Sequence, residues 1–586
     1  MIEPLFLVDL NAELRQIKSL QPEKLRRKNL LDFQDKLSKL KFFDPACGSG
    51  NFLTESFICL RRLENDILRE LFGAQIQLGA FNNPIKVSIQ QFFGIEINDF
   101  ACTVARTALW IAELQMIQET QEIIHRDLNF LPLKSYANII EGNALRLDWK
   151  NILPPDVNFI MGNPPFVGYS FQSQEQKADI LNVYKSENGK PYKKAGKIDY
   201  VAAWYFKAAE FSQSKKIRCA FVSTNSITQG EQVANVWKIL VERFNLHIDF
   251  AYRTFKWSSE SANMAAVHCV IIGFSTSPST KQKIIFDGEE KIVVQNINFY
   301  LQDSATVFIE SRTKPICNVP EMIYGNKPTE GGNLIIEAND YADFIKKEPA
   351  AKKFIRPLIG ADEFINGKKR YCLWLVDAAP NEIKKMPLVY QRVKNVRDFR
   401  LKSAKAQMHE DANRPTEFQE IRQSATSYIL VPRVSSENRR YIPMGFLPPN
   451  VIASDAVQII PDATIYHFGI LTSSIHMAWM RAVAGRLKSD YRYSATIVYN
   501  NFVWCDPTAE QRRTIEKTAQ NILDVRAQYP DATLADLYND ILMPKNLRDA
   551  HKENDSAVMA AYKFSADFTE SDIVIEVFKL YERRQL

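Results

Sequence analysis

An asparagine, two prolines and an aromatic residue follow directly behind an apolar run in the stretch IMGNPPFVG. The side-chain oxygen of Asn163 and the backbone carbonyl of Pro164 can accept the two hydrogens of one amine. Pro164 and Pro165 restrict the backbone, so the direction of that carbonyl is fixed. Phe166 offers an apolar face on which a heterocyclic base can stack. These residue types are suited to holding the amine of a base. The simpler alternative for the four residues alone is a Pro-Pro turn that ends a strand.

An exocyclic amine on a base is a poor nucleophile because its lone pair is delocalised into the ring. Acceptors on both of its hydrogens localise that lone pair and direct it at an electrophile, and this needs neither a metal nor a catalytic base. A base inside a duplex must first leave the stack to reach such a loop. The chemistry indicated is therefore transfer of a group to a base amine, with no metal required.

A glycine-containing turn lies in the stretch FFDPACGSGNFL, where an apolar strand ends at Asp44 and a helix is predicted to follow. The small residues Gly48, Ser49 and Gly50 allow the backbone to approach a ligand closely. The spacing is not GxGxxG, and no Lys-Ser/Thr pair follows, so dinucleotides and triphosphates fit the loop poorly. On the loop alone, a tight turn that only packs a strand against a helix is an equal alternative.

Two further strand ends carry polar residues. The run QFFGIEIN ends in Glu96, whose carboxylate can accept hydrogen bonds from two adjacent ribose hydroxyls, and EGNALRLDW places Asn143 and Ala144 after another strand. Asn143 can bond the edge of an adenine and Ala144 can pack against it. An ordinary solvated carboxylate is the alternative for Glu96. Together with the glycine turn, these strand ends predict one nucleoside-shaped site.

Alternating strands and helices must position these residues. Short apolar runs alternate with helix-like segments between about residues 41 and 275, which predicts a mainly parallel α/β sheet. The runs are KFFDPA, QFFGIEI, ANIIEG, VNFIMG, IRCAFVST, HIDFAY and AVHCVIIGF. We expect four regions, namely a helical lead-in over 1–40, the α/β domain over 41–310, a second domain of short strands and turns over 311–505, and a helical C-terminal region over 506–586.

The glycine turn and the NPPF loop together resemble the amino-methylating DNA methyltransferases that use S-adenosyl-L-methionine. The resemblance implies that Glu96 holds the ribose, Ile97 packs on the adenine and Asn143, with Ala144, contacts its edge, although the family more often has Asp at the position of Asn143. It also implies that the methionine portion is surrounded by Asp44, Pro45, Ala46, Cys47, Gly48, Gly50, Asn51 and Phe52. In this family Asn before Pro-Pro goes mostly with adenine N6, and the motif order is that of the gamma group.

A wider resemblance covers residues 4 to about 505. Stretches such as DYVAAWYFKAAEF, EMIYGNKPTEGGNLI and LTSSIHMAWMRAVAGRLKSDYRYS are similar to the MmeI-like restriction-modification enzymes. The resemblance implies a Rossmann-like class I methyltransferase domain, a mixed α+β target-recognition domain and a helical C-terminal segment. That family carries an N-terminal nuclease and a helical connector, which we expect this chain to lack. The expected partners are double-stranded DNA and a separate nuclease or the missing N-terminal half.

A formal nuclease pattern is also present, with Pro155-Asp156 followed by Glu175-Gln176-Lys177 as PD…ExK. It brackets the NPPF loop, so we do not expect it to form a magnesium nuclease site.

Contacts to DNA are expected in the second domain. Residues 384–405 carry eight basic residues against one acidic, which suits a phosphate-binding face or, equally, a solvated amphipathic helix. The stretch PRVSSENRRY adds Arg433, Arg439 and Arg440 beside serines on a predicted loop, a pattern typical of contacts to the DNA backbone.

Base reading is predicted in the stretch GRLKSDYRYS. If this stretch is one extended strand, Lys488, Asp490 and Arg492 point to one side. Lysine can donate to guanine and aspartate can accept from cytosine, so the first two could read one G·C pair. A salt-bridged surface strand is the alternative. Phe255 and Trp257, which we expect just before a strand, could form a wall around a flipped base, with core packing as the alternative.

Composition excludes several protein classes. Hydrophobic residues make up 46% of the 586 residues, which is typical of a globular chain. No apolar run reaches the roughly 18 residues of a membrane span, and no secretory signal is present, so we expect a cytoplasmic protein without a membrane partner. The eight cysteines form no CxxC pair, which argues against a zinc knuckle or a disulfide framework. The net charge of +6 is too small to indicate a nucleic-acid partner by itself.

The sequence therefore predicts a site-specific adenine-N6 DNA methyltransferase. Two alternatives stay open, namely a non-catalytic DNA-binding remnant of such an enzyme and an RNA or protein amino-methyltransferase.

Overall fold

The computed structural model describes residues 1–72, 83–125, 128, 138–257, 267–278 and 281–585. They form two compact units, which are taken in turn. The first comprises Met1–Thr228 with Gln232–Phe308, and the second comprises Gln229–Glu231 with the chain from Ile309 onward.

The first unit is built on a sheet that contains nine strands among the described residues, in the order β3-β2-β1-β4-β5-β7-β6-β8-β9. The strands are β1 (Phe42–Asp44), β2 (Phe92–Glu96), β3 (Asn138–Glu141), β4 (Phe159–Gly162), β5 (Arg218–Thr224), β6 (His247–Trp257), β7 (Val267–Ser275), β8 (Lys283–Asp287) and β9 (Glu290–Val294). The first five pair in parallel, and β7 runs antiparallel to both of its neighbours. Each of the seven predicted apolar runs overlaps one of β1–β7, which confirms the predicted Rossmann-like α/β fold.

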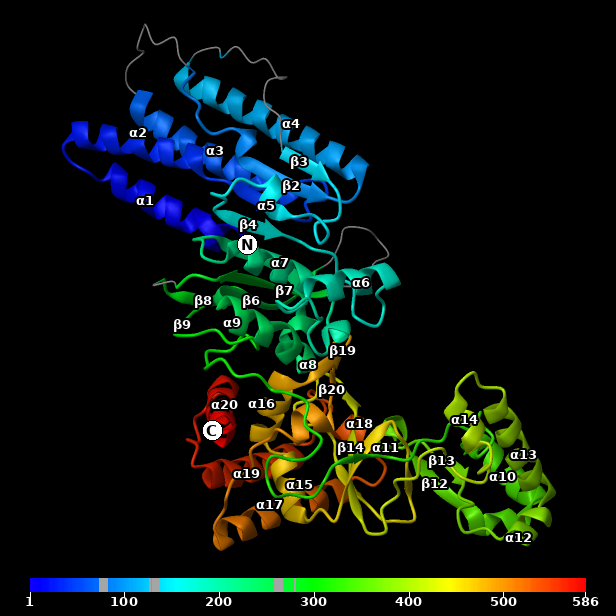
Figure 1. Ribbon diagram of the computed structural model, residues 1–586. Helices are drawn as coiled ribbons and strands as arrows, with labels where there is room; N and C mark the ends of the chain where they lie inside the picture. Colours follow the sequence, from blue (N-terminus) through cyan, green and yellow to red (C-terminus); the bar gives the residue numbers. More distant parts are fainter. Residues whose placement is uncertain (73–82, 126–127, 129–137, 258–266, 279–280, 586) are drawn as a thin grey trace. The chain divides into compact units, whose positions relative to one another are not determined.

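Helices precede β1 and lie between most of the strands that follow it. They are α1 (Val8–Lys18), α2 (Glu23–Lys39), α3 (Asn51–Phe72), α4 (Asp99–Ile124), α5 (Trp149–Ile152), α6 (Gln174–Val183), α7 (Ala202–Ser212), α8 (Gly230–Gln232) and α9 (Lys238–Phe244), with shorter turns η1 (Glu3–Leu7), η2 (Ile89–Gln91), η3 (Ala195–Lys197), η4 (Asn225–Thr228) and η5 (Val233–Trp237). Helices α3 and α4 pack side by side along the β1–β2 part of the sheet (Figure 1).

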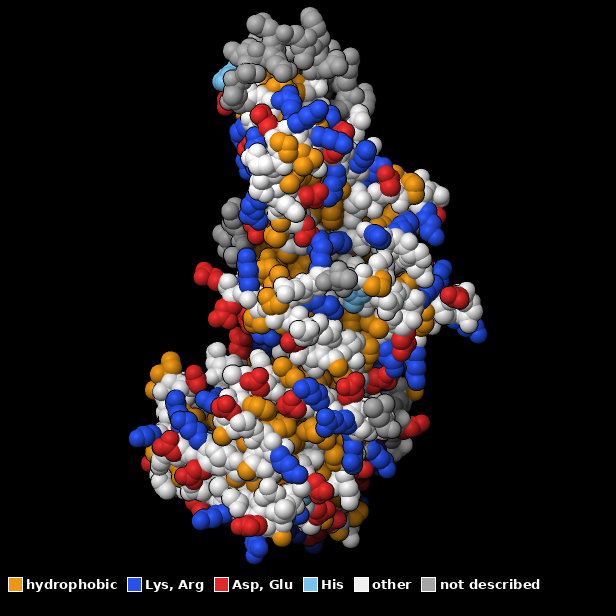
Figure 2. Space-filling model, turned by 90° about the vertical axis from the view of Figure 1, so that its left-hand side faces the viewer, with side chains coloured by type: hydrophobic (Ala, Val, Ile, Leu, Met, Phe, Trp, Pro, Cys, Tyr) orange, Lys and Arg blue, Asp and Glu red, His pale blue; other side chains and the backbone are white. Residues whose placement is uncertain are grey.

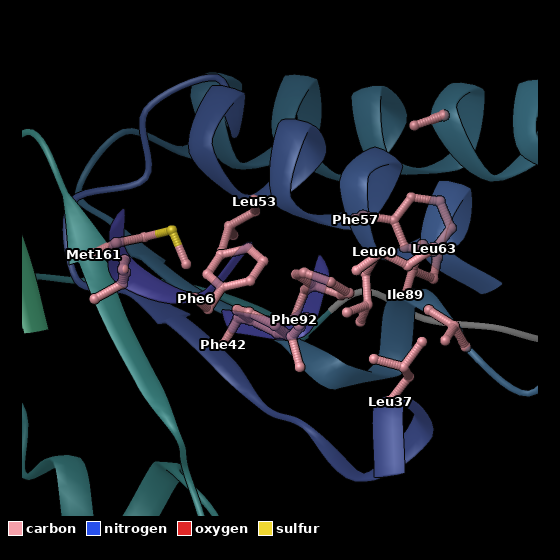
Figure 3. Close-up of a cluster of buried hydrophobic side chains, with 14 of the residues drawn as sticks. Phe6, Leu37, Phe42, Leu53, Phe57, Leu60, Leu63, Ile89, Phe92 and Met161 are labelled. Atoms are coloured by element: carbon pink, nitrogen blue, oxygen red, sulfur yellow. The ribbon is translucent and has the colours of Figure 1, made fainter. Parts of the chain in front are cut away.

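An aromatic core holds the sheet against α3. The rings of Phe42 and Phe92, on neighbouring strands, stack with centroids 4.8 Å apart, and Phe6 packs edge-on against Phe42. Figure 3 shows these rings beneath the α3 side chains, with Leu53 and Phe57 among them. Burying each such side chain contributes roughly 1.5–3 kcal/mol. This packing fixes the ends of β1 and β2 relative to the start of α3.

The hairpin β8–β9 at the sheet edge was not foreseen from the sequence. Its turn has Gly288 at φ 59°, directly after Asp287. Asp287 pairs with Glu290, so the loop is Gly288-Glu289. A glycine at the first loop position is a recognised hairpin signal and could have revealed the turn.

The second unit contains three small sheets among its described residues, with strand orders β10-β18-β14-β16, β11-β13-β12-β17 and β15-β20-β19. The strands are β10 (Ile323–Tyr324), β11 (Ile335–Glu337), β12 (Ile355–Ile359), β13 (Arg370–Leu373), β14 (Tyr428–Pro432), β15 (Val434–Ser435), β16 (Gly445–Leu447), β17 (Ile452–Ala453), β18 (Val457–Pro461), β19 (Gly485–Leu487) and β20 (Asp490–Arg492). Most pairs are antiparallel, and the mixture of short strands and helices confirms the predicted α+β character.

The second unit also contains helices. They are α10 (Ala338–Lys347), α11 (Ala361–Asn366), α12 (Pro380–Lys384), α13 (Pro387–Leu401), α14 (Ala406–Asp411), α15 (Ile465–Leu471), α16 (Ser474–Val483), α17 (Ala509–Ala527), α18 (Leu534–Leu537), α19 (Lys545–Tyr562) and α20 (Glu570–Gln585), with η6 (Pro349–Phe354) and η7 (Ala495–Tyr499). Thr508 caps α17, accepting a hydrogen bond from the Gln511 amide in a capping box. The C-terminal helical segment is thus confirmed. Among the described helices of both units, none combines the length and hydropathy that a membrane crossing requires.

Candidate active site

The strand order of the first unit reverses between β1 and β4, which lie side by side with β2 and β5 on their outer flanks. Ligands of parallel α/β sheets bind beyond the carboxyl ends of the strands at such a reversal. β1 ends at Asp44 and β4 ends at Gly162, the residue before Asn163. The fold therefore brings the glycine turn and the NPPF loop to one place.

The turn after β1 is held tightly by backbone hydrogen bonds. The Cys47 amide donates to the carbonyl of Ile95 at 3.0 Å, and the Gly50 amide donates to the Cys47 carbonyl at 2.7 Å. Gly48 and Gly50 have φ of 52° and 83°, which residues with a Cβ rarely adopt. A Cβ on Gly50 would also lie 3.0 Å from that of Ala105. The glycines are thus required by the turn itself, whatever it binds.

Asp44 is a buried carboxylate with one unsatisfied oxygen. Its Oδ1 accepts the Ala46 amide at 2.9 Å, whereas Oδ2 has no hydrogen-bond partner and the side chain is fully buried. Burial, helped by the charge of Glu96, raises the pKa of Asp44 to about 8. An unpaired buried carboxylate is costly unless a cation or donor meets it. The ammonium of a methionine portion would meet this need, so the residues fit S-adenosyl-L-methionine.

Glu96 connects the turn after β1 to the start of α4. Its Oε2 accepts the Gly48 amide at 2.9 Å and its Oε1 accepts the Asn98 amide at 3.0 Å. Each carboxylate oxygen keeps a lone pair for a further donor. Beside it, Ile97 and Phe100 are 68% and 73% exposed, so both apolar side chains are free to cover a planar ring. Phe100 was not singled out from the sequence.

Asn143 follows β3, and its side chain is already engaged. Its Oδ1 accepts the Leu145 amide at 2.9 Å, and its Nδ2 donates to Asp179 Oδ2 at 3.1 Å. Ala144 is buried, and its carbonyl accepts from the indole of Trp149 at 2.9 Å. Asp179, on α6, lies 36 residues away in the chain and no sequence signal pointed to it.

The NPPF loop presents its polar group outward. Asn163 and Pro165 are exposed, Pro164 is buried, and Phe166 is half-buried against the hydrophobic core. One face of the Phe166 ring is therefore committed to the protein.

The segment behind the NPPF loop is fixed by a second buried carboxylate. Asp199 accepts the Tyr169 amide at 3.0 Å and the Ser226 hydroxyl at 2.5 Å. The Tyr200 amide donates to the carbonyl of Val167 at 2.9 Å. The loop is thus held from η4 and from the start of α7, and Asp199 is a further residue that sequence reasoning missed.

Comparison with known proteins supports one family across the whole chain. The family models described as MmeI, DNA-methyltransferase domain, MmeI, target recognition domain, and MmeI, C-terminal domain match residues 20–287, 303–506 and 507–585. The structure of the type IIL restriction-modification enzyme MmeI in complex with DNA is 44% identical, with a TM-score of 0.88, and the match covers all of this chain and 77% of that one. This chain belongs to the MmeI family.

Curated relatives extend the picture. The chain is 40% identical over 586 residues to DNA methyltransferase A of Bacillus subtilis (strain 168), covering 99% of this chain and 65% of that protein. It is 28% identical over 177 residues to the type II restriction enzyme and methyltransferase RM.Eco57I of Escherichia coli, covering 27% of this chain and 17% of that protein. The chain thus spans less than two thirds of the length of these relatives. The predicted resemblance to MmeI-like enzymes is confirmed.

The predicted base-reading stretch lies inside the segment that matches the MmeI target recognition domain, but it is not one extended strand. β19 and β20 form an antiparallel hairpin in which Leu487 pairs with Asp490. Lys488 is at the turn, with φ of 58°, and is exposed. The expectation that Lys488 shares one strand face with Asp490 and Arg492 is therefore wrong, because the chain reverses between them. Asp490 and Arg492 remain on one face of β20, opposite the buried Tyr491.

The three arginines that follow β14 lie on either side of β15 and differ in their environments. Arg433 donates to the carbonyl of Asp455 at 2.8 Å, and its guanidinium lies 4.8 Å from the ring centroid of Tyr324. Arg439 and Arg440 line a cavity of about 700 Å³ together with Lys552. Burial lowers the pKa of Arg439.

The basic run 384–405 is in part structural. Arg400 on α13 is fully buried and donates to backbone carbonyls, including those of Asp411 at 2.9 Å and Glu417 at 2.7 Å. Arg392 likewise donates to the carbonyl of Asn333 at 2.8 Å. On the face shown in Figure 2, basic and acidic side chains are interspersed, with no large patch of one sign. On this face, charge alone therefore does not locate the DNA contacts.

The remaining predictions concern positions in the first unit. Phe255 and Trp257 precede β7, as expected, but they lie within β6, which extends beyond the predicted run HIDFAY. There Phe255 pairs with Cys269 and Trp257 with Val267. Phe255 packs against the core, whereas Trp257 is 40% exposed.

The PD…ExK pattern is split between separate ion pairs. Asp156 pairs with Lys41 at 2.5 Å, while Glu175 lies 3.7 Å from Arg146. The part of the chain that the structure describes holds no group of three or more His, Cys, Asp or Glu side chains suited to a metal ion.

Proposed function

We propose that this chain is a site-specific DNA methyltransferase of a restriction-modification system, which methylates N6 of an adenine flipped out of duplex DNA. One observation carries the proposal. The buried, unsatisfied carboxylate of Asp44 and the NPPF loop meet at the strand-order reversal of a chain that belongs to the MmeI family. The division into a methyltransferase domain over 41–310, a recognition domain over 311–505 and a C-terminal region over 506–586 is part of the proposal.

The turn after β1 and the neighbouring strand ends would hold S-adenosyl-L-methionine. Asp44 would accept from its ammonium and Glu96 from its ribose hydroxyls, while Ile97 and Ala144 would contact the adenine and Asn143 its amino edge. The remaining residues of the turn, Pro45, Ala46, Cys47, Gly48, Gly50, Asn51 and Phe52, would supply its backbone and walls. When bound, this group supplies an electrophilic methyl group.

The NPPF loop would activate the target amine. The Asn163 side-chain oxygen and the Pro164 carbonyl accept its two hydrogens, and Pro165 holds that carbonyl in direction. Both acceptors also stabilise the positive charge that develops on the amine nitrogen during the transfer, as fixed dipoles do in other active sites. Phe166 receives the extruded base on its free face, and Phe255 with Trp257 forms the opposite wall. No residue of the chain needs to act as a metal ligand.

Double-stranded DNA is the proposed substrate. The related MmeI enzyme was solved in complex with DNA, and the segment matching the MmeI target recognition domain includes the β19–β20 hairpin. Asp490 and Arg492 would contact bases, and Lys488, Arg433, Arg439 and Arg440 would contact the DNA backbone. A nuclease, on a separate protein or on an N-terminal half, is the second proposed partner.

A transfer assay with alternative acceptors tests the proposal. The chain is incubated with tritiated S-adenosyl-L-methionine and, separately, with unmethylated genomic DNA, RNA or a protein mixture. We expect label in DNA alone. Tight DNA binding without label would instead identify a non-catalytic remnant, and label in RNA or protein would identify a different amino-methyltransferase. Binding of S-adenosylhomocysteine, measured in parallel, shows that the protein is folded.

A further inference from the structure

Asp179 is a buried carboxylate beside the proposed adenine site. It lies on α6, the helix that follows the NPPF loop, and only 4% of its side chain is exposed. Its Oδ1 accepts from Arg146 Nε at 2.7 Å, and its Oδ2 accepts from the hydroxyl of Tyr200 at 3.0 Å and from Asn143 Nδ2 at 3.1 Å. Three donors from two parts of the first unit, the turn after β3 and the segment before α7, therefore converge on one side chain.

The hydroxyl of Tyr200 stays a donor in this cluster. Burial and the charge of Asp179 raise the pKa of Tyr200, so it does not ionise in the neutral range. Arg146 is permanently charged. Arg146 and Tyr200 therefore both donate hydrogen bonds to the Asp179 carboxylate and hold it in place. Its oxygen can then only accept from the Asn143 amide.

The orientation of the Asn143 amide follows from these contacts. A side-chain amide can present either its oxygen or its NH2 group in one direction, and its hydrogen-bond partners decide which. Nδ2 is taken by Asp179, and Oδ1 accepts the Leu145 amide, so both contacts favour the same orientation. Oδ1 keeps a second lone pair, and a neighbouring amino group could use it.

We propose that Asp179 is a positioning residue that fixes the Asn143 amide with its oxygen as an acceptor, and so makes the site specific for an adenine nucleoside over a hypoxanthine nucleoside. The inference rests on the proposed function, because it assigns the ligand of that same site. Adenine carries a 6-amino donor, whereas hypoxanthine carries a 6-oxo acceptor that would face Asn143 Oδ1 without a hydrogen between them. A carboxylate at position 143 would likewise face the Asp179 carboxylate with no hydrogen between the two acceptors. This accounts for Asn143, where the resembled family more often has Asp.

Binding of two ligands to the full chain tests this role without catalysis. Isothermal titration calorimetry compares S-adenosylhomocysteine with S-inosylhomocysteine, which differ only at the base. We expect the wild-type chain to prefer the adenosyl ligand by about 10- to 100-fold, since a mispaired buried polar group costs that much. Asp179→Ala removes one of the two contacts that orient the amide and leaves only the Leu145 amide, so it should reduce this preference at least about threefold.

A matched control is available on the same helix. Glu175 is an exposed carboxylate that also lies near Arg146, at 3.7 Å, and this ion pair does not involve Asn143. Glu175→Gln removes one charge from α6 but should leave the ligand preference unchanged. If Asp179→Ala keeps the wild-type preference, or if Glu175→Gln lowers it equally, the positioning role is wrong.

A reciprocal pair keeps the test decisive if Asp179→Ala fails to fold. Asn143→Asp places two carboxylates together and should weaken binding of the adenosyl ligand at least tenfold. Adding Asp179→Asn restores one amide and one carboxylate, and we expect most of the affinity to return. A double variant that is no better than Asn143→Asp overturns the inference. If the wild-type chain binds neither ligand, the proposed function is overturned as well. If binding and methyl transfer are normal but Asp179→Ala keeps the wild-type ligand preference, only this inference is overturned.

Discussion

A Cβ atom on Gly162 would lie 2.5 Å from Oδ1 of Asp44. Gly162 ends β4 directly before the NPPF loop, and Asp44 ends β1 at the start of the glycine turn. The absence of a side chain at position 162 therefore lets the two loops approach as closely as they do.

Gly162→Ala should impair both the fold and the site. The added methyl group must displace the buried Asp44 carboxylate, and overpacking of this kind costs roughly 1–3 kcal/mol. We expect a lower midpoint of thermal unfolding and weaker binding of S-adenosylhomocysteine. Gly196→Ala is the matched control, since a Cβ there meets nothing within 4 Å. Wild-type stability and binding in Gly162→Ala would show that Asp44 can move freely.

Asp44 should make the stability of the ligand-free chain depend on pH. Burial raises its pKa to about 8, above its unfolded value, so between about pH 4 and 8 the folded state binds more protons than the unfolded state. The free energy of unfolding then falls as pH rises through this window, by at most about 1.4 kcal/mol per pH unit. Asp44→Asn should remove this contribution, measured by urea unfolding at several pH values.

The control for that slope is Asp362→Asn. Asp362 is exposed, and its hydrogen bond with Lys368 lowers its pKa, the opposite direction to Asp44. The Asp362→Asn variant should show the same fall in the free energy of unfolding between about pH 5 and 8 as the wild type, because Asp362 titrates below that range. An Asp44→Asn profile that is parallel to that of the wild type would mean that Asp44 is ionised in the folded chain.

Ligand binding should displace the proton of Asp44. Near neutral pH the buried carboxyl is mostly protonated, and an ammonium beside it would lower its pKa again. We expect calorimetric titration of S-adenosylhomocysteine, in buffers of different ionisation enthalpy, to show release of close to one proton by the wild type and none by Asp44→Asn. Equal proton release by both proteins would place the ammonium elsewhere.

Asp490→Asn should relax the methylated sequence at one position. Asp490 lies on β20 beside the exposed turn, and a carboxylate contact with cytosine discriminates by roughly 1–3 kcal/mol. Sequencing of methylated sites on a random DNA library measures the change, with Asp362→Asn as a surface control. A motif identical to that of the wild type would show that Asp490 reads no base.

Features that depend on residues close together in the sequence could be predicted, whereas contacts between residues far apart in the sequence could not. The strands β1–β7 and the loops at Asp44 and Asn163 follow from apolar runs and local turn residues. Asp179 and Asp199 were missed because their side-chain contacts join residues 21 to 36 positions apart, and no spacing in the sequence indicates such contacts.

Two errors have local causes. The hairpin between β19 and β20 was missed because its turn uses Lys488 at φ 58° in place of a Gly or Asn signal. Arg400 counted as a basic surface residue in the run 384–405, although its side chain is buried among carbonyl groups. A run of charges in a sequence does not distinguish these two environments.

The most direct measurement identifies the methylated nucleoside. The chain is incubated with DNA amplified in vitro, which carries no methyl marks, and with S-adenosyl-L-methionine bearing a deuterated methyl group. The DNA is then digested to nucleosides and analysed by mass spectrometry. The Asn163→Ala variant is treated in parallel. Asn163 is exposed, so the variant should fold normally and bind S-adenosylhomocysteine as the wild type does. We predict labelled N6-methyldeoxyadenosine from the wild type and a loss of at least about 100-fold in the variant. Label in N4-methyldeoxycytidine, or equal label from both proteins, would contradict methylation of adenine by the NPPF loop.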